Sequence, residues 1–307
     1  MPKPRGRRSQ RPARWPGHWP GKRFMWPLLA VAAIGLAGVG FLVLRPDPGG
    51  EGSAGSVAPW ATLGTADVHS LAFDPADSQH LYFGHHGGLL ESRDGGRSWS
   101  STTLRDVDAM NVKPAGDGRI QIAGHDVYVE SSDGGQSWQP VPNDLPGLDL
   151  HAFAVDPVDP SQAWAFAVGF GLFSSTDAGR HWEPRQQGNW PSLSAFRDDD
   201  APILVAISEA GLQRSDDQGS TWRPLPAPPG QLIAVTAAVD GSTLYIATAD
   251  GVYRSADEGS TWTATAFEGA ALTLTVAPDD SNLLAVVDEA TRLFRSSDSG
   301  SSFPGSP

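Results

Sequence analysis

The sequence contains no cysteine among its 307 residues. A disulfide framework is therefore excluded, and so is a lipid anchor attached through an N-terminal cysteine. Without covalent cross-links the fold must be held by its hydrophobic core, and the chain tolerates either redox compartment. The length allows one large all-β domain or two smaller ones, so the number of domains has to be decided from patterns within the chain.

Acidic residues are absent from the first 45 positions, which contain eight Lys or Arg up to Arg23. An uncharged apolar run follows from Trp26 to Leu44, and its 19 residues are just enough to span the hydrocarbon core as a helix. The basic flank predicts a cytoplasmic N-terminus and places the chain after Arg45 outside the cytoplasm. A cleaved signal peptide is the alternative, but no A-x-A pattern follows Leu44.

These features divide the chain into a basic cytoplasmic segment (1–25), a transmembrane signal anchor in the inner or cell membrane (26–44), a flexible Gly/Pro/Ser-rich linker (45–56) and a periplasmic or extracellular domain (57–307). From residue 46 onward there are 13 Lys or Arg against 35 Asp or Glu, a net charge of about −22. This charge argues against nucleic acid or an anionic membrane surface as a partner of the domain. Solubility alone is the simpler explanation of the acidic composition.

One eight-residue pattern returns along the chain with aromatic residues spaced by 39 to 44 positions. The copies are "SRDGGRSW" at Ser92, "SSDGGQSW" at Ser131, "STDAGRHW" at Ser175, "SDDQGSTW" at Ser215, "SADEGSTW" at Ser255 and a weaker "SSDSGSSF" at Ser296. A residue that recurs once in every structural unit is unlikely to be a unique catalyst. The repeat therefore indicates the architecture of the domain and does not mark a catalytic site.

Each repeat contains about four short apolar segments separated by turn residues, which indicates an all-β architecture. About 40 residues for four strands is the period of a β-propeller blade. The sixth copy reaches Phe303 with too little chain left for a fourth strand, whereas "VAPWATLG" around Trp60 resembles that missing strand. The sequence predicts a six-bladed propeller over residues 57–307, closed by its N-terminal strand so that no open edge remains.

The residue types of the repeated segment predict a structural role for its aspartates. Asp and Ser oxygens accept hydrogen bonds from nearby backbone N–H groups and stabilise tight turns, and the glycine permits a positive φ. The aromatic residue can bury a large area between blades, contributing on the order of 2 kcal/mol. The six structural aspartates are Asp94, Asp133, Asp177, Asp217, Asp257 and Asp298.

The segments resemble the Asp-box, or BNR, repeat of sialidase-like propellers. They are also similar to propellers of sortilin-type receptors, of photosystem II assembly factors and of bacterial BNR proteins labelled as glycosyl hydrolases. The resemblance covers nearly the whole domain, with five strong copies and one weak copy. It implies the propeller fold but does not select an activity, because one fold carries many functions.

Propeller geometry places the start of each innermost strand and the turn between the second and third strands at one face, and the repeated segments at the other. Five histidines and one aspartate fall at the first of these faces in blades one to three. They are His69, His85, His86, Asp108, His125 and His151. These imidazoles and the carboxylate would suit Zn²⁺, Cu²⁺ or another divalent ion. Solvent-facing turns and hydrogen-bonded channel residues are the alternative, since no HxH or HExxH motif is present.

A sialidase, as the resemblance implies, needs three arginines that bind the substrate carboxylate. It also needs a tyrosine nucleophile activated by a glutamate, and an aspartate that acts as general acid and base. Only four tyrosines exist in the chain, and Arg93, Arg97, Arg180, Arg214, Arg254 and Arg295 lie in or beside the repeated segments. Tyr128 and Glu130 share a strand face without converging on a channel. We therefore expect a membrane-tethered, non-catalytic module that binds a protein, glycan or metal, with an exo-acting glycoside hydrolase as the alternative.

Overall fold

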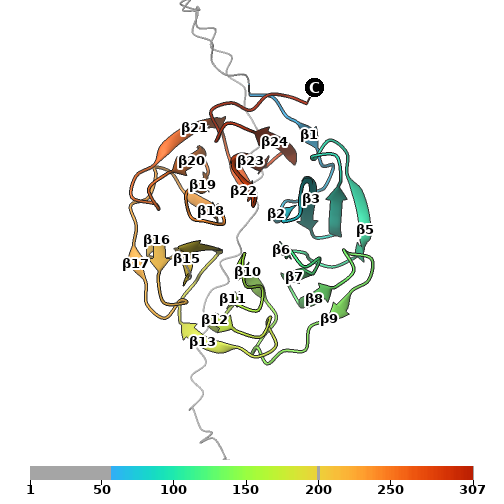
Figure 1. Cartoon of the computed structure of the whole chain (residues 1–307), viewed down its shortest axis with the longest axis vertical. Coiled ribbons are helices and arrows are strands. Elements are labelled where there is room, and N and C mark those ends of the chain that lie inside the picture. Colours follow the sequence, from blue (N-terminus) through green and yellow to red (C-terminus); the bar gives the residue numbers. More distant parts are fainter. Residues whose placement is uncertain (1–56, 199–200, 307) are drawn as a thin grey trace, which may run out of the picture. The chain divides into compact units, whose positions relative to one another are not determined.

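The computed structural model describes residues 57–198 and 201–306. These residues form 24 short strands in six four-stranded antiparallel sheets, which Figure 1 shows arranged around a central axis. The prediction of an all-β, six-bladed propeller is confirmed. In the described ranges no helix is long and apolar enough to cross a membrane. The anchor predicted at 26–44 lies outside the described residues, as do the segments 1–25 and 45–56.

The blades follow one another along the chain. The first three are β2 (Ser70–Asp74), β3 (Asp77–His85), β4 (Gly88–Ser92) and β5 (Ser100–Arg105); β6 (Asn111–Pro114), β7 (Ile120–Gly124), β8 (Val127–Ser131) and β9 (Gln139–Pro140); and β10 (Leu150–Val155), β11 (Ala163–Ala167), β12 (Gly171–Ser175) and β13 (Glu183–Gln186).

The remaining three blades are β14 (Ser192–Asp198), β15 (Ala201–Ser208), β16 (Gly211–Ser215) and β17 (Arg223–Pro224); β18 (Leu232–Ala237), β19 (Leu244–Thr248), β20 (Gly251–Ser255) and β21 (Thr263–Glu268); and β22 (Ala271–Ala277), β23 (Asp280–Asp288) and β24 (Arg292–Ser296) with β1 (Ala61–Thr62).

The ring closes through β1, which pairs antiparallel with β24 as the outermost strand of the sixth blade. The Trp60 N–H donates to the Leu293 carbonyl at 2.7 Å, and the Ala58 N–H donates to the Phe303 carbonyl at 2.9 Å. The guanidinium groups of Arg97 and Arg295 lie over the Trp60 ring at 4.8 and 5.4 Å from its centroid. The N-terminal strand thus completes the last blade as the sequence predicts.

The hydrophobic core is divided among the interfaces between neighbouring blades. Between the second and third blades, for example, Tyr128 of β8 packs on Phe153 of β10 and on Trp182, with ring centroids 5.6 and 6.4 Å apart. The Trp182 indole N–H donates to the Gly179 carbonyl at 2.8 Å, so this buried aromatic leaves no polar atom unpaired. Trp182 therefore contributes to both the turn and the core.

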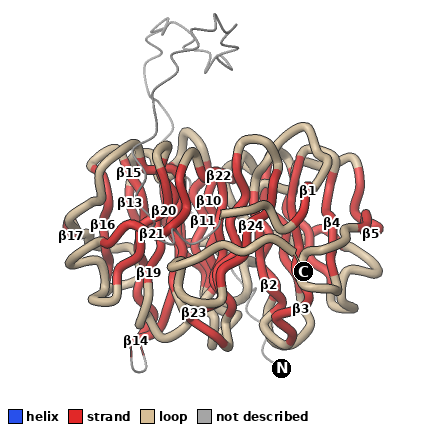
Figure 2. The backbone as a smooth tube through the Cα atoms, turned by 90° about the horizontal axis from the view of Figure 1, so that it is seen from above, coloured by secondary structure: helices blue, strands red, loops and turns tan. Residues whose placement is uncertain are grey.

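The strands run between two faces on which the loops gather, as the view in Figure 2 shows. We call the face where the innermost strands begin the upper face; it also carries the turns that join the second and third strands of each blade. The opposite, lower face carries the six repeated segments, and we call the turns formed by their first five residues the S-x-D-x-G turns. The alternating strand directions of an antiparallel sheet dictate this division. The repeated segments and the five candidate histidines therefore lie on opposite faces of the propeller.

Candidate functional site

Blades one to three bring seven histidine and aspartate side chains together on the upper face, and we call them the His/Asp cluster. Its members are Asp67, His69, His86, Asp108, His125, Asp149 and His151. They precede or begin the innermost strands β2, β6 and β10, or lie in the turns after β3 and β7. A β-bulge between Leu150 and Ala152 falls on His151 at the edge of the sheet, where such bulges re-aim side chains.

The first part of the cluster consists of Asp67, His69 and His86. The His69 Nε2 atom lies 3.2 Å from both Asp67 Oδ2 and His86 Nδ1. The distance between His86 Nδ1 and Asp67 Oδ2 is 2.5 Å, and the His86 backbone N–H donates to the same carboxylate oxygen at 2.9 Å. Three atoms that can each donate an electron pair therefore face one another.

The second part consists of His125, Asp149 and His151. The Nε2 atoms of the two histidines lie 2.9 Å apart. Asp149 Oδ1 lies 3.2 Å from His125 Nε2 and 3.0 Å from His151 Nε2. The backbones of His125 and Asp149 form an isolated β-bridge, which holds the two side chains next to each other.

Asp108 joins the two parts. Its Oδ1 atom lies 3.0 Å from His69 Nε2, and its Oδ2 atom lies 2.5 Å from His125 Nδ1. The side chain of Asp108 is only 12% exposed, so these contacts are little screened by water. The cluster is continuous across three blades because of this one carboxylate.

Two glycines allow the segment around Asp108 to approach the neighbouring strands. A Cβ atom at Gly124 would lie 2.0 Å from the Asp108 carbonyl oxygen, and one at Gly84 would lie 2.1 Å from the Ala109 carbonyl oxygen. Contacts this short with backbone atoms cannot be accommodated by a side-chain movement. Because neither position has a side chain, the backbone of Asp108 and Ala109 can pack directly against strands β7 and β3.

The local environment shifts the pKa of two members of the first part. Desolvation lowers the pKa of His69 and outweighs the nearby Asp108 carboxylate, which raises it. For Asp67, desolvation raises the pKa, but hydrogen bonds from His86 prevail and the pKa is lowered. The arrangement therefore favours a neutral imidazole beside a charged carboxylate, which are the forms that bind a metal ion.

The other histidines of the propeller lie apart from the cluster. His85 stacks on Phe83 with ring centroids 6.2 Å apart, and its Nδ1 accepts the Gly87 N–H. Burial lowers the pKa of His85. His80 lies within β3 between the carboxylates of Asp74 and Glu91. Of the six residues proposed from sequence, the structure thus brings together all but His85.

Asp67 and Asp149 belong to the cluster although the sequence analysis did not select them. The signal was present as a repeated D-x-H pattern, "DVH" at Asp67 and "DLH" at Asp149, with "DVD" at the equivalent place in the second blade. Two residues apart at the start of an innermost strand, the aspartate and the histidine of each pair point to the same side.

The six aspartates of the S-x-D-x-G turns lie on the lower face and make the same hydrogen bonds in every blade. In the first turn Asp94 accepts from the Ser92 hydroxyl at 2.8 Å and from the Ser98 N–H at 2.9 Å. Equivalent bonds are made by Asp133, Asp177, Asp217, Asp257 and Asp298. The hydrogen bonds of these six carboxylates therefore stabilise the turns.

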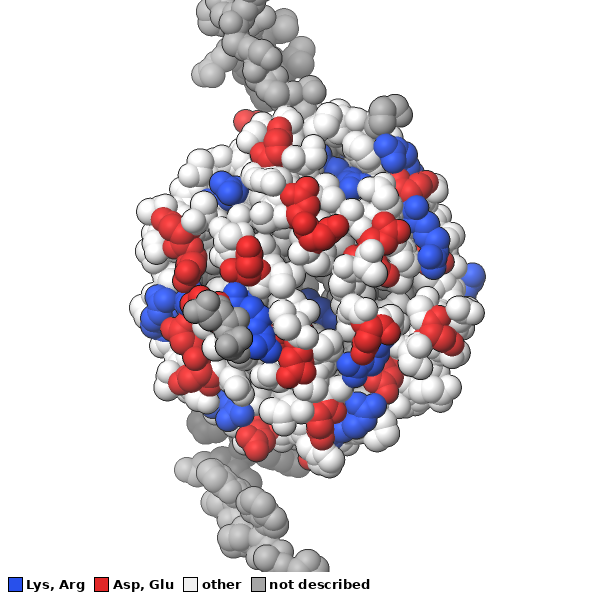
Figure 3. All heavy atoms as spheres, in the orientation of Figure 1, with Lys and Arg blue, Asp and Glu red and all other residues white. Residues whose placement is uncertain are grey.

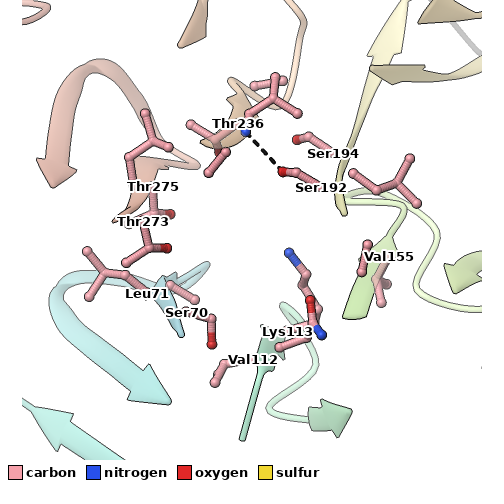
Figure 4. Close-up of a pocket in the computed structure, with 18 of the residues that line it drawn as sticks. Ser70, Leu71, Val112, Lys113, Val155, Ser192, Ser194, Thr236, Thr273 and Thr275 are labelled. Carbon is pink, nitrogen blue, oxygen red and sulfur yellow. Dashed lines mark hydrogen bonds between the residues drawn. The ribbon is translucent and has the colours of Figure 1, made fainter. Parts of the chain in front are cut away.

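A cavity of about 340 Å³ lies on the axis, lined by the innermost strands of all six blades and by His69 and His151 from the cluster. Hydroxyl groups of Ser and Thr line much of it, and the Ser192 hydroxyl accepts the Val235 N–H at 3.0 Å. The Lys113 side chain reaches into the space between the strands in Figure 4, and desolvation lowers its pKa to about 8. In the orientation of Figure 3 the propeller is hollowed at this centre.

The residues expected for sialidase chemistry do not meet in this cavity. Tyr82, Tyr128 and Tyr245 are buried within the blades, with at most 3% of each exposed. Glu130 pairs with Arg180 at 2.8 Å instead of activating Tyr128, whose hydroxyl accepts from Gln121. No arginine of the described ranges is among the residues that line the cavity.

Comparison with known proteins identifies the relatives of this propeller. The family model for the photosynthesis system II assembly factor YCF48 matches residues 54–213, and a DUF6242 beta propeller domain model matches residues 208–304. No curated protein matches the sequence.

Several solved structures share the fold. A structure of YCF48 bound to a D1 peptide is 21% identical with a TM-score of 0.50, covering 83% of this chain and 85% of that one. YCF48 from Cyanidioschyzon merolae is 18% identical with a TM-score of 0.51, covering 80% and 88%. The GH74 xyloglucanase from Xanthomonas campestris is 18% identical with a TM-score of 0.55, covering 80% of this chain and 46% of that one.

At these identities the solved structures show the fold alone. The family model matches just over half of the chain, from the linker through the first three blades and into the fourth. The expected kinship with BNR-type propellers is confirmed at that level, without a specific likeness to sialidases. The chain belongs to the family of the photosynthesis system II assembly factor YCF48.

Proposed function

We propose that this propeller is a non-catalytic module that binds an extended segment of a partner protein at its central cavity and upper face. The observation that carries the proposal is Lys113, the one lysine after Lys22 and the one basic Lys or Arg side chain among the described residues that line the cavity. No described residue forms a hydrogen bond or ion pair with its ammonium group. A desolvated, unpaired charge costs stability unless a ligand pairs with it.

The chemistry around Lys113 suits a polar segment that carries an anionic group. Its pKa of about 8 leaves the ammonium group mostly charged at neutral pH. Hydroxyl groups of Ser70, Ser194 and Thr273 surround the same space and can bond to a peptide backbone (Figure 4). Membership in the YCF48 family supports a protein ligand, because a YCF48 structure contains a bound D1 peptide.

We further propose that the module acts outside the cytoplasm, in the periplasm or at the cell surface, tethered through residues 26–44. The support for this location is the sequence pattern of a basic segment, an apolar run and a flexible linker.

An exo-acting glycoside hydrolase has less support. The GH74 xyloglucanase resembles the chain in fold, but its identity of 18% carries no activity with it. The buried tyrosines and the absence of arginine from the cavity lining of the described residues argue against a sialidase mechanism. Release of sugar from sialylated or xyloglucan substrates by the purified chain would favour this alternative.

Site-specific photo-crosslinking tests the binding proposal. We would place benzoylphenylalanine at Ser194, which lines the cavity, or at Ser101, which is exposed on the outer strand β5, in the full-length chain in its own cell. We expect a discrete protein adduct from Ser194 that is absent from Ser101. Lys113→Met should reduce the Ser194 adduct at least several-fold because it removes the charge but keeps the length. Adducts of equal yield at both positions, or none at either, would contradict the proposal.

A further inference from the structure

We propose that the His/Asp cluster binds two divalent metal ions of the Zn²⁺ type in two sites that Asp108 connects. Site A comprises Asp67 Oδ2, His69 Nε2 and His86 Nδ1. Site B comprises His125 Nε2, Asp149 Oδ1 and His151 Nε2. This inference is independent of the peptide-binding proposal, although His69 and His151 lie at the mouth of the same cavity.

In each site the ligand atoms lie close enough together to surround one tetrahedral ion, and somewhat closer than they would with the ion bound. Ligands at 2.0–2.2 Å from Zn²⁺ lie about 3.3–3.6 Å from one another. In site A His69 Nε2 lies 3.2 Å from Asp67 Oδ2 and from His86 Nδ1, and these two atoms lie 2.5 Å apart. In site B all three distances between ligand atoms are 2.9 to 3.2 Å. Within each triad the ligand atoms lie no more than 4.8 Å apart.

The donor types select the kind of metal. Each site combines two imidazole nitrogens with carboxylate oxygen, which suits Zn²⁺ and related transition metals better than Ca²⁺ or Mg²⁺, whose ligands are oxygen atoms. The net charge of about −22 after residue 46 also favours cations over anions at this face. His86 and His125 have side chains that are 60% and 45% exposed, so an ion can reach both sites from solvent.

Two buried oxygen atoms give a separate reason to place cations here. Asp108 Oδ1 and Asp149 Oδ1 are both buried, and neither accepts a hydrogen bond from any described residue. Each nevertheless lies 3.0 Å from an imidazole nitrogen, of His69 and His151 respectively. A buried carboxylate oxygen without a hydrogen-bond partner is costly, and a cation beside it would satisfy it.

Asp108 has a different role at each site. At site A its Oδ1 atom lies 3.0 Å from His69 Nε2, beside the three ligands. At site B its Oδ2 atom accepts the proton of His125 Nδ1, which fixes the tautomer that leaves His125 Nε2 free to bind the ion. An ion in site A attracts the Asp108 carboxylate and so weakens the hydrogen bond between Asp108 and His125. We therefore expect two affinities, the second ion binding more weakly than the first.

Zn²⁺ titration of the full-length chain, purified without a histidine tag and stripped with chelator, tests the proposal by calorimetry and elemental analysis. We expect two bound ions in the parent. His86→Ala should remove one, His151→Ala should remove the other, and Co²⁺ in place of Zn²⁺ should give the visible absorption of a tetrahedral complex. His181→Ala is the matched control, because this exposed histidine pairs with Asp177 away from the cluster and its loss should change nothing.

Asp108→Asn tests the connection between the sites. It keeps the shape of the side chain but removes the negative charge, and its single carbonyl oxygen cannot face His69 and His125 at once, so both affinities should fall about 10- to 100-fold. Asp149→Asn should weaken site B alone. Circular dichroism confirms that each variant is folded. The proposal is overturned if the parent binds no ion, if it binds one ion, or if His86→Ala and His151→Ala bind as the His181→Ala control does. Peptide crosslinking from Ser194 can succeed or fail independently of these outcomes.

Discussion

At the scale of single residues, the S-x-D-x-G turns place both their fourth and their fifth residues in the left-handed region. The fifth is glycine in all six turns, but the fourth is glycine only at Gly95 and Gly134. Ala178, Gln218, Glu258 and Ser299 occupy the fourth position elsewhere, with φ between 56° and 61°. A residue with a Cβ atom is strained in this conformation, so four of the turns store a small unfavourable energy.

Gln218→Gly should therefore stabilise the protein, by up to about 1 kcal/mol after the entropy that glycine adds to the unfolded chain is counted. The Gln218 backbone carbonyl accepts the Trp164 indole N–H, and this bond is kept. Urea unfolding of parent and variant measures the difference. The reverse change, Gly134→Ala, is the control: its Cβ would meet no atom within 4 Å, so φ alone should make it destabilising. Equal stability of Gln218→Gly and the parent would show that the strain is absent.

Part of the His/Asp cluster could be predicted from the sequence and part could not. Histidines at repeat-equivalent positions predicted much of the cluster because the propeller period fixes which residues begin an innermost strand. His85 and His86 are adjacent in one turn, and only the backbone direction at that turn decides that His86 faces Asp67 while His85 packs on Phe83. The contacts of Asp108 with two blades depend on close approach at Gly84 and Gly124, which no local pattern reveals.

At the scale of elements, the strand β1 decides whether the sixth blade is complete. The number and order of strands could be predicted because each repeat carries its own turn residues. The pairing of Ala61 with Leu293 could be predicted only from the incomplete last repeat, since no local signal links positions so distant. Without β1, the strand β24 would present an unpaired edge, which favours association with other chains.

A chain shortened to residues 64–307 should consequently unfold at a lower temperature than residues 57–307, by on the order of 10 °C if the lost strand contributes a few kcal/mol. It should also self-associate, because the edge of β24 becomes available. Differential scanning calorimetry and size-exclusion chromatography measure the two effects. Trp60→Ala provides a milder comparison, since it removes the ring beneath Arg97 and Arg295 but leaves the strand backbone. Identical melting of the two chains would show that closure contributes no stability.

At the scale of the whole molecule, the six turn aspartates form a ring of carboxylates whose charged forms are favoured by folding. Hydroxyl hydrogen bonds from Ser98, Ser137 and Thr261 lower the pKa of Asp94, Asp133 and Asp257 to about 2. The His181 hydrogen bond lowers the pKa of Asp177. Desolvation raises the pKa of Asp217 and Asp298, but their hydrogen bonds outweigh it.

Stability should fall as the pH falls from about 4 to 2. A lowered folded-state pKa stabilises the protein fully above the unfolded value near 3.9, and this contribution is lost as the pH approaches the folded value. Near pH 3, Asp94, Asp133 and Asp257 together should make unfolding take up roughly two to three protons. The slope of unfolding free energy against pH at constant ionic strength measures this uptake. In Asp257→Asn the slope should be smaller by nearly one proton; a slope equal to the parent's would contradict the assignment.

The closure of the ring through β1 also orders the events of folding. Five blades consist of four strands that follow one another along the chain, so each can form from neighbouring hairpins. The sixth needs residues 61–62 and residues 292–293 to meet across the length of the domain, and contacts of such large sequence separation are slow to form. During synthesis β1 is therefore the first strand to be made and the last that can be placed.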